Sequence, residues 1–149
     1  MKISAKGRYG LRALVDLFLN SKEEHVALFS IAQRQGISVQ YLEHVFSALR
    51  RAGIVRSIKG AKGGYVLAIE AEMLTISTIL CALEGNLTIM DSISREEQDP
   101  KNCIEKAVCN LIWQPLDERL MTILESVTLL DLAGESKRLK EVEDPMFYI

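Results

Sequence analysis

Apolar residues in the first part of the chain recur at helical spacing in two short segments. The first segment predicts a helix over residues 5–20 that begins after Ser4 as its N-cap. The residues expected to be buried on this helix are Leu11, Leu14, Val15 and Phe18. The second segment predicts a helix over residues 28–35 that ends at Gly36. The residues expected to face inward from it are Ile31 and Ala32.

A third segment combines a helix with a two-stranded hairpin. Ser38 is a good N-cap, and Gly53 is expected to end the helix. Between them, one apolar stripe on a 3.6-residue period consists of Leu42, Val45, Phe46 and Leu49. Two short runs typical of strands follow, 54–58 and 65–68, and the tip between them, 59–64, is rich in glycine and lysine. This order predicts a winged helix-turn-helix with a positively charged wing.

The second part of the chain predicts more helices. Ser77 is expected to cap one that runs to about Leu83, and residues 103–109 predict another. A longer helix follows, and its apolar residues are spaced by three or four positions: Ile112, Leu116, Leu120, Ile123 and Val127. Such a stripe is typical of a helix that packs against another helix. Thr128 is expected to cap a last short helix, 129–133, before a charged tail.

Charge is divided unevenly along the chain. Residues 1–69 contain eleven Lys and Arg against four Asp and Glu, a net of +7, whereas residues 70–149 have a net of −9. A single basic residue can simply solvate a surface, but this segregation predicts that the first part meets a polyanion. A winged helix that binds only other proteins is disfavoured for the same reason.

The composition narrows the class of protein further. There is no run of about eighteen apolar residues and no charged-then-apolar leader, so we expect a cytoplasmic protein without membrane association. Three cysteines, an odd number, argue against a disulfide scaffold and leave metal or redox chemistry open. No nucleophile, base and orienting group assemble into a catalytic pattern, so an enzyme is not expected.

Several short motifs in order resemble one known family. They are the opening residues 1–11, Ser30-Ile31-Ala32, Tyr41-Leu42-Glu43, the junction 49–55 and the wing tip 60–65. Together they resemble the bacterial winged-helix regulators that include the iron-sulfur regulator IscR and the cysteine-metabolism repressor CymR. The resemblance implies a homodimer, held by the long C-terminal helix, that binds a partly palindromic double-stranded operator and usually represses transcription.

The predicted fold is therefore mainly α with a small β-hairpin wing, as a winged helix-turn-helix domain plus a C-terminal dimerisation helix. The predicted DNA-binding domain spans residues 1–69 and a connector with the sensing region spans 70–110. The dimerisation helix and final short helix take 111–134, and the tail takes 135–149.

The DNA contacts can be predicted residue by residue. The start of the recognition helix is expected to reach base edges or nearby phosphates through Ser38, Val39, Gln40, Tyr41 and His44. Gln40 is the best reader of adenine, because its amide can both donate and accept. Lys59 and Lys62 of the wing suit a minor groove or its phosphates. Further predicted contacts are Lys2, Ser4, Lys6, Arg8, Tyr9, Arg50 and Arg51.

Two alternatives stay open for these contacts. Tyr41 could instead pack on the first helix. Arg50 or Arg51 could serve the negative end of the recognition-helix dipole.

The sensing chemistry rests on two cysteines. Cys103 and Cys109 resemble the last two positions of the three-cysteine motif that holds a 2Fe-2S cluster in IscR-like members, but Ser92 stands where the first cysteine is expected. A cluster needs four ligands, and a serine hydroxyl is a poor substitute for a thiolate. The chain has lost a stable cluster, or Ser92 replaces a native cysteine, or another ligand compensates.

Compensating ligands would have to come from the rest of the chain. Cys81 is expected to be a buried core thiol, because its helix neighbours are apolar. Glu43, His44 and Glu105 are the other candidates. Glu43 is of most interest, because a ligand on the recognition helix would couple the cluster to DNA binding. Its alternative is an ordinary exposed carboxylate.

The C-terminal residues suggest a different input. The apolar run in 144–149 resembles the tail of CymR-like members, which are controlled by complex formation with O-acetylserine thiol-lyase. The alternative is a tail that packs back on the dimer. The sequence thus predicts a repressor of iron-sulfur cluster biogenesis genes that senses through a cluster, or else a cluster-free repressor of cysteine and sulfur metabolism.

Overall fold

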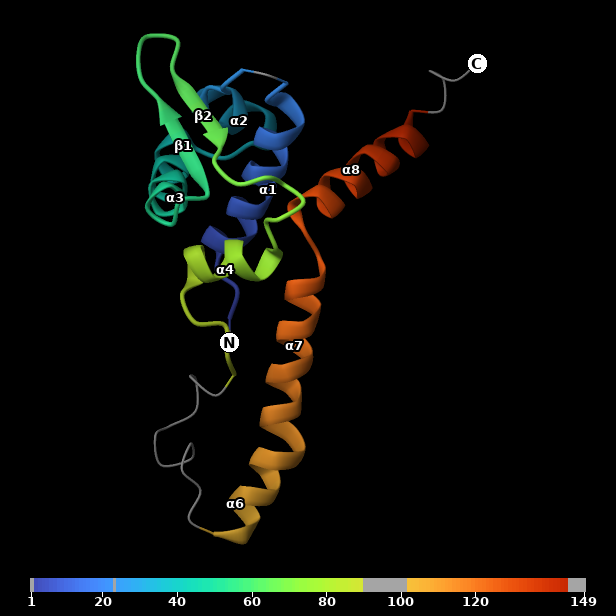
Figure 1. Ribbon diagram of the computed structural model, residues 1–149. Helices are drawn as coiled ribbons and strands as arrows, with labels where there is room; N and C mark the ends of the chain where they lie inside the picture. The colour runs from blue at the N-terminus through green and yellow to red at the C-terminus, as the bar shows by residue number, and fades with distance from the viewer. Residues whose placement is uncertain (1, 23, 90–101, 145–149) are drawn as a thin grey trace.

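The computed structural model describes residues 2–22, 24–89 and 102–144 (Figure 1). The first part of the chain folds into α1 (Ala5–Asn20), α2 (Leu28–Gln35), α3 (Val39–Arg51), β1 (Val55–Ile58), β2 (Gly64–Leu67) and α4 (Ile76–Glu84). The second part contains α6 (Cys103–Val108), a π-helical turn (Cys109–Trp113), α7 (Gln114–Ser126) and α8 (Leu129–Glu143). The predicted mainly helical fold with a hairpin wing is confirmed.

The helices α2 and α3 begin and end where the sequence predicts. The Oγ of Ser38 accepts a hydrogen bond from the backbone N–H of Tyr41 (3.2 Å), which caps α3. Gly36 and Gly53 follow the two helices with φ of 65° and 75°, a backbone conformation that other residues adopt at a cost. The bounds of the recognition helix are therefore set by local backbone preferences.

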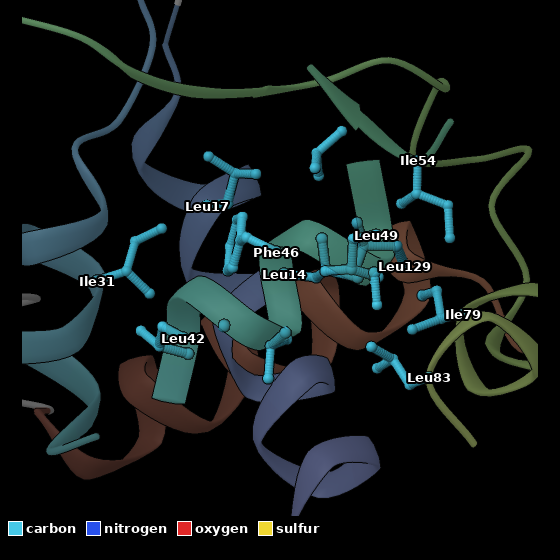
Figure 2. Close-up of a cluster of buried hydrophobic side chains, with 14 of the residues drawn as sticks. Leu14, Leu17, Ile31, Leu42, Phe46, Leu49, Ile54, Ile79, Leu83 and Leu129 are labelled. Atoms are coloured by element: carbon cyan, nitrogen blue, oxygen red, sulfur yellow. The ribbon is translucent and has the colours of Figure 1, made fainter. Parts of the chain in front are cut away.

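Five helices and the hairpin contribute to a single hydrophobic core (Figure 2). The predicted stripe of α3 lies at its centre, with all four side chains fully buried. The contributions from other elements include Leu14, Leu17, Ile31, Ile54, Ile79, Leu83 and Leu129. Because α4 and the start of α8 take part in this core, the winged helix is fastened to the C-terminal part of the chain.

The buried face of α1 is rotated from the predicted one. Leu14 is buried, but Leu11, Val15 and Phe18 are only half-buried. The residues that face the core most closely are Gly7, Gly10, Ala13, Leu14 and Leu17. The prediction missed this face because glycine and alanine carry no strong hydrophobic signal, although small residues allow the closest approach of two helices.

Ser4 occupies the predicted N-cap position of α1 but does not cap through its side chain, and the predicted N-cap of α4 is wrong. The side chain of Ser4 makes no cap bond within α1 and instead donates to Glu84 of α4. Thr75, not Ser77, caps α4, and its Oγ1 accepts from the N–H of Thr78 (3.2 Å). Ser77 is buried inside the helix. Several hydroxyl residues cluster at 75–78, and only the backbone conformation decides which one caps.

The last helix is much longer than predicted. Thr128 caps α8 through a capping box with Asp131, as expected, but the helix continues to Glu143 rather than ending at Ala133. Beyond the first turns α8 projects away from the other helices (Figure 1). Its exposed turns are mostly polar and carry only isolated apolar residues, Leu139 and Val142, so no apolar period indicated them. They include an ion pair of Arg138 with Glu135 (2.6 Å), whose hydrogen bond lowers the pKa of Glu135 and raises that of Arg138.

Much of the apolar stripe of α7 is exposed to solvent. Leu116 and Ile123 are 45% and 62% exposed, and Leu111 in the π-helical turn is 74% exposed. Backbone bonds at the end of α7 hold it to the segment before α4, since Ile76 N–H donates to Val127 (2.9 Å) and Leu129 N–H donates to Leu74 (2.8 Å). These bonds hold the C-terminal end of α7, and much of its apolar face is open to solvent.

An ion pair between a buried aspartate and a partly exposed arginine links α1 to α2. Asp16 is 5% exposed and accepts from Arg34 Nη2 (2.7 Å) and Nε (3.0 Å) and from Gln35 Nε2 (2.9 Å). The hydrogen bond with Asp16 raises the pKa of the Arg34 guanidinium. Within the described residues, no helix is long and apolar enough to cross a membrane.

Candidate nucleic-acid interface

The solvent-facing side of α3 carries polar and basic side chains along its whole length. Gln40, His44 and Arg51 are exposed and lie on one face, because they are separated by four and seven residues. Glu43 is exposed on the neighbouring face. The opposite side of the helix is buried in the core, so this face is held outward rigidly. A helix with such a face has the form required to enter a major groove.

Aromatic contacts tie the start of α3 to α1. The rings of Tyr9 and Tyr41 meet edge to face with centroids 5.6 Å apart. The guanidinium groups of Arg8 and Arg12 lie 5.8 and 5.3 Å from the centre of the Tyr9 ring. The sequence alternative for Tyr41 is therefore what the structure shows: its ring packs against α1. The Tyr9 ring, which contacts Tyr41, thereby places Arg8 and Arg12 beside the recognition helix.

The wing is a short antiparallel hairpin with a basic tip. Val55 pairs with Leu67 and Ile58 with Gly64. Lys59 and Lys62 are both exposed at the tip, which Figure 1 shows beyond α3. The structure thus places the two lysines on the element that the sequence predicts, clear of the core.

The wing is fastened to the segment between α1 and α2. Val26 and Tyr65 exchange two backbone hydrogen bonds of 2.9 and 2.8 Å, and Nε2 of His25 donates to the carbonyl of Lys62. The ring of Tyr65 packs on Phe46 of α3 with centroids 4.8 Å apart. A Cβ at Gly64 would lie 2.3 Å from the carbonyl oxygen of Val26, so glycine permits this close approach. These contacts hold the wing at a fixed angle to α3.

The residues before and within the first turn of α1 form a basic arm. Lys2 and Arg8 are exposed, and Lys6 is half-buried. The carboxylate of Glu84 accepts from the backbone N–H and the hydroxyl of Ser4, at 2.9 and 2.6 Å. The hydroxyl hydrogen of Ser4 is thus already used within the protein.

The structure places most predicted DNA contacts on one of three elements: α3, the wing or the basic arm. Val39 is half-buried against the core rather than fully outward. Arg50 and Arg51 are exposed in the last turn of α3, where they also suit the negative end of its dipole. Their contact with DNA stays a prediction.

Two residues that contact elements of this interface were missed from the sequence. Arg12 is exposed one helical turn after Arg8 and donates to the carbonyl of Gln35. Its spacing of four from Arg8 was the available signal. His25 lies in a loop, and nothing in the sequence indicates its bond to the wing.

The two cysteines of the predicted cluster motif lie at the far end of α7 from the winged helix (Figure 1). Cys103 is exposed at the start of α6, and Cys109 is half-buried at the start of the π-helical turn. Six helical residues separate them by about 9 Å along the axis and by roughly 240° around it. The two thiols therefore do not share one face of the helix.

The other predicted ligands do not complete a cluster site. Within residues 2–22, 24–89 and 102–144 no three His, Cys, Asp or Glu side chains group as metal ligands. Glu43 and His44 lie on α3, at the opposite end of the protomer from α6 (Figure 1). Cys81 is exposed on α4, so its prediction as a buried thiol is wrong. Glu105 lies on α6 itself. Ser92 and residues 145–149 fall outside the described residues. The described side chains by themselves do not supply the four ligands that a 2Fe-2S cluster needs.

Comparison with known proteins decides the family. The profile of the Rrf2 family, described as iron-dependent transcriptional regulators, matches residues 3–135. The chain belongs to the Rrf2 family. Its relatives are transcriptional regulators and not enzymes.

Two kinds of Rrf2 protein resemble the chain about equally. It is 39% identical over 149 residues to the regulator CymR of Bacillus subtilis, and the match covers all of both chains. It is 35% identical over 145 residues to the regulator IscR of Vibrio atlanticus, which covers 97% of this chain and 81% of that protein.

Solved structures of both kinds share the fold. The structure of CymR, titled the global cysteine regulator of B. subtilis, superposes with a TM-score of 0.77 at 38% identity and covers 91% of this chain and 98% of that one. The structure of T. potens IscR superposes with a TM-score of 0.71 at 36% identity and covers 91% and 88%. The resemblance inferred from the short motifs is confirmed, and this Rrf2 chain is a transcriptional regulator.

Proposed function

We propose that the protein is a repressor that binds a partly palindromic operator as a homodimer. The observation that carries the proposal is the rigid surface in which the exposed face of α3, the basic wing and the basic arm are all locked to one core. Gln40 and His44 would read base edges in the major groove, while Lys59 and Lys62 would contact the neighbouring backbone or minor groove. Gel shifts on an operator fragment at two salt concentrations test it.

The apolar face of α7 supports the homodimer. A groove of about 570 Å³ runs beside this helix and is lined in part by Ile3, Leu116 and Ile123. An exposed apolar stripe on a helix that is held at one end is the form of a helix-to-helix interface. Pairing two copies along α7 would place two recognition helices for two half-sites.

For the input, we propose control by cysteine or sulfur metabolism without a resident cluster. Two features support this choice: Ser92 stands where the first cysteine of the cluster motif is expected, and the match to CymR extends over the full length of both chains. A cluster-sensing regulator is the second candidate. Its support is the description of the family as iron-dependent and the retained pair Cys103 and Cys109.

Replacing Lys59 tests the wing as a backbone contact. We expect Lys59→Ala to weaken binding to specific and nonspecific DNA alike, because a protein with one phosphate contact fewer releases fewer counterions from the DNA when it binds. The slope of log K against log salt should fall by about one unit. The matched control is Lys137→Ala, which removes the same charge from an exposed position on α8. An unchanged slope with lost sequence preference would show that Lys59 reads bases.

Reconstitution with iron and sulfide separates the two inputs. We expect the chain to retain no visible cluster absorption after desalting, because Ser92 replaces one of the three expected thiolates and the described residues contain no group of three metal ligands. The comparison variant is Ser92→Cys, which supplies a thiol where the first cysteine of the cluster motif is expected. A stable cluster spectrum in the unmodified chain would overturn cluster-free control. Cluster absorption that appears only in Ser92→Cys would show that the serine at position 92 prevents the cluster from binding.

A further inference from the structure

One carboxylate of α4 caps the start of α1 from outside the helix. Oε1 of Glu84 accepts three hydrogen bonds: from Ser4 N–H (2.9 Å), Ser4 Oγ (2.6 Å) and Gly7 N–H (2.9 Å). The first N–H groups of a helix have no partner within the helix, so an external acceptor stabilises them. Glu84 does for α1 what an N-cap side chain normally does.

Two glycines make this contact possible. A Cβ at Gly7 would lie 2.4 Å from Glu84 Oε1, and a Cβ at Gly10 would lie 2.3 Å from Leu83 Cδ1. The last turn of α4 therefore rests on a strip of bare α1 backbone. The position of the basic arm is set by α4 and not by α1 alone.

The same segment connects to the helix that we propose as the dimer interface. Gly85 ends α4, Leu87 is buried in the core, and the N–H of Ile89 donates to Asp117 Oδ1 of α7 (2.5 Å). A short stretch of chain thus links α7 to the start of α1. The arms of the two protomers would be positioned relative to the dimer helices through this stretch.

We propose that Glu84 is a positioning residue for DNA binding: it orders the basic arm so that Lys2 meets a phosphate. This proposal rests on the proposed operator binding. The arm has no other described side-chain anchor at Ser4, because the Ser4 hydroxyl and backbone N–H both bond to Glu84. Without that anchor the packing of Ile3 against the core would be the main remaining restraint on the arm, and Lys2 would lose more entropy on binding.

Electrostatics and positioning predict opposite effects of removing this carboxylate. Glu84 is a negative charge beside a surface that meets a polyanion, so charge alone predicts that Glu84→Ala binds DNA more tightly. Positioning predicts weaker binding, because the lysine contact is lost with the arm. Glu72→Ala is the matched control. It removes the same charge from an exposed residue of the same part of the chain for which the described residues show no hydrogen bond or ion pair.

The experiment measures operator affinity and its salt dependence for the full-length variants, with thermal unfolding as a check on folding. We expect Glu84→Ala to bind about fivefold more weakly at 0.15 M salt, with a salt slope lower by about one, as one lost phosphate contact implies. Glu72→Ala should bind as tightly as the parent or more tightly. Glu84→Gln keeps an acceptor oxygen without the charge and should bind within about twofold of the parent, which keeps the test decisive if Glu84→Ala folds poorly.

A double-mutant cycle with Lys2→Ala completes the test. Lys2→Ala should weaken binding in the parent chain and have almost no effect in Glu84→Ala, because the arm is then already lost. Equal effects of Lys2→Ala in both backgrounds, or tighter binding by Glu84→Ala, would overturn the positioning role. Failure of the parent chain itself to bind the operator would instead remove the proposed function.

Discussion

Gly64→Ala is expected to detach the wing and to abolish most of its contribution to DNA binding. The added Cβ would lie 2.3 Å from the carbonyl oxygen and 2.5 Å from the carbonyl carbon of Val26, and these are backbone atoms that cannot rotate away. The two hydrogen bonds between Val26 and Tyr65 must break or lengthen. Their loss should lower the free energy of unfolding by about 2 kcal/mol, at about 1 kcal/mol for each bond.

The displacement of the wing should be visible in DNA binding. If Lys59 and Lys62 both lose a phosphate contact, affinity at 0.15 M salt falls about 30-fold and the salt slope falls by about two. Gel shifts and thermal unfolding measure the two effects separately. Gly134→Ala is the control, because nothing lies within 4 Å of a Cβ there and alanine favours the α8 helix. Full operator affinity in Gly64→Ala would mean that the fixed angle of the wing is not required.

Ile123→Glu is expected to convert the proposed homodimer into a monomer of 16.7 kDa. Ile123 is 62% exposed in the single chain, so a charge there costs little within one protomer, but it would be buried without a partner in an α7 pair. Operator affinity should fall at least about 100-fold, because one protomer reaches only one half-site and loses half of the phosphate contacts. Light scattering coupled to size exclusion measures the mass, and gel shifts measure the affinity.

A neighbouring variant controls for the added charge. Thr122→Glu introduces the same charge at an exposed position about 100° around the helix from Ile123. It should remain a dimer and bind the operator. A dimer that persists in Ile123→Glu would place the interface elsewhere than on the apolar face of α7.

The sequence predicted the elements that depend on local patterns. The four apolar residues of α3 recur at helical spacing, and all four are fully buried. Ser38 and Gly53 bound the helix as expected. The wing was predicted from its two strand-like runs and its glycine- and lysine-rich tip. The corrections at Ser4, Ser77 and the length of α8 arose where local patterns offered several equivalent choices or none.

The same dependence on local patterns explains which residues of the candidate interface were predicted. Polar and basic residues at helix starts and hairpin tips can be recognised from position alone, so the exposure of Lys59, Lys62 and Gln40 was predicted, while their contact with DNA stays a prediction. Arg12 and His25 were not, because their roles come from residues distant in sequence: the ring of Tyr9, the carbonyl of Gln35 and the carbonyl of Lys62. Cys81 was misplaced because apolar neighbours on a helix do not say which face the helix buries.

The sequence by itself determined the winged helix-turn-helix, its basic charge and its family, because periodicity, turn chemistry and motif order are local properties of the chain. Only the tertiary structure decided how these parts are held together. Glu84 caps α1, Gly64 admits Val26 to the wing, and Tyr9 meets Tyr41, each across a gap in sequence that no local pattern spans. Such contacts depend on which backbones approach closely, and that is settled by the packing of the whole core.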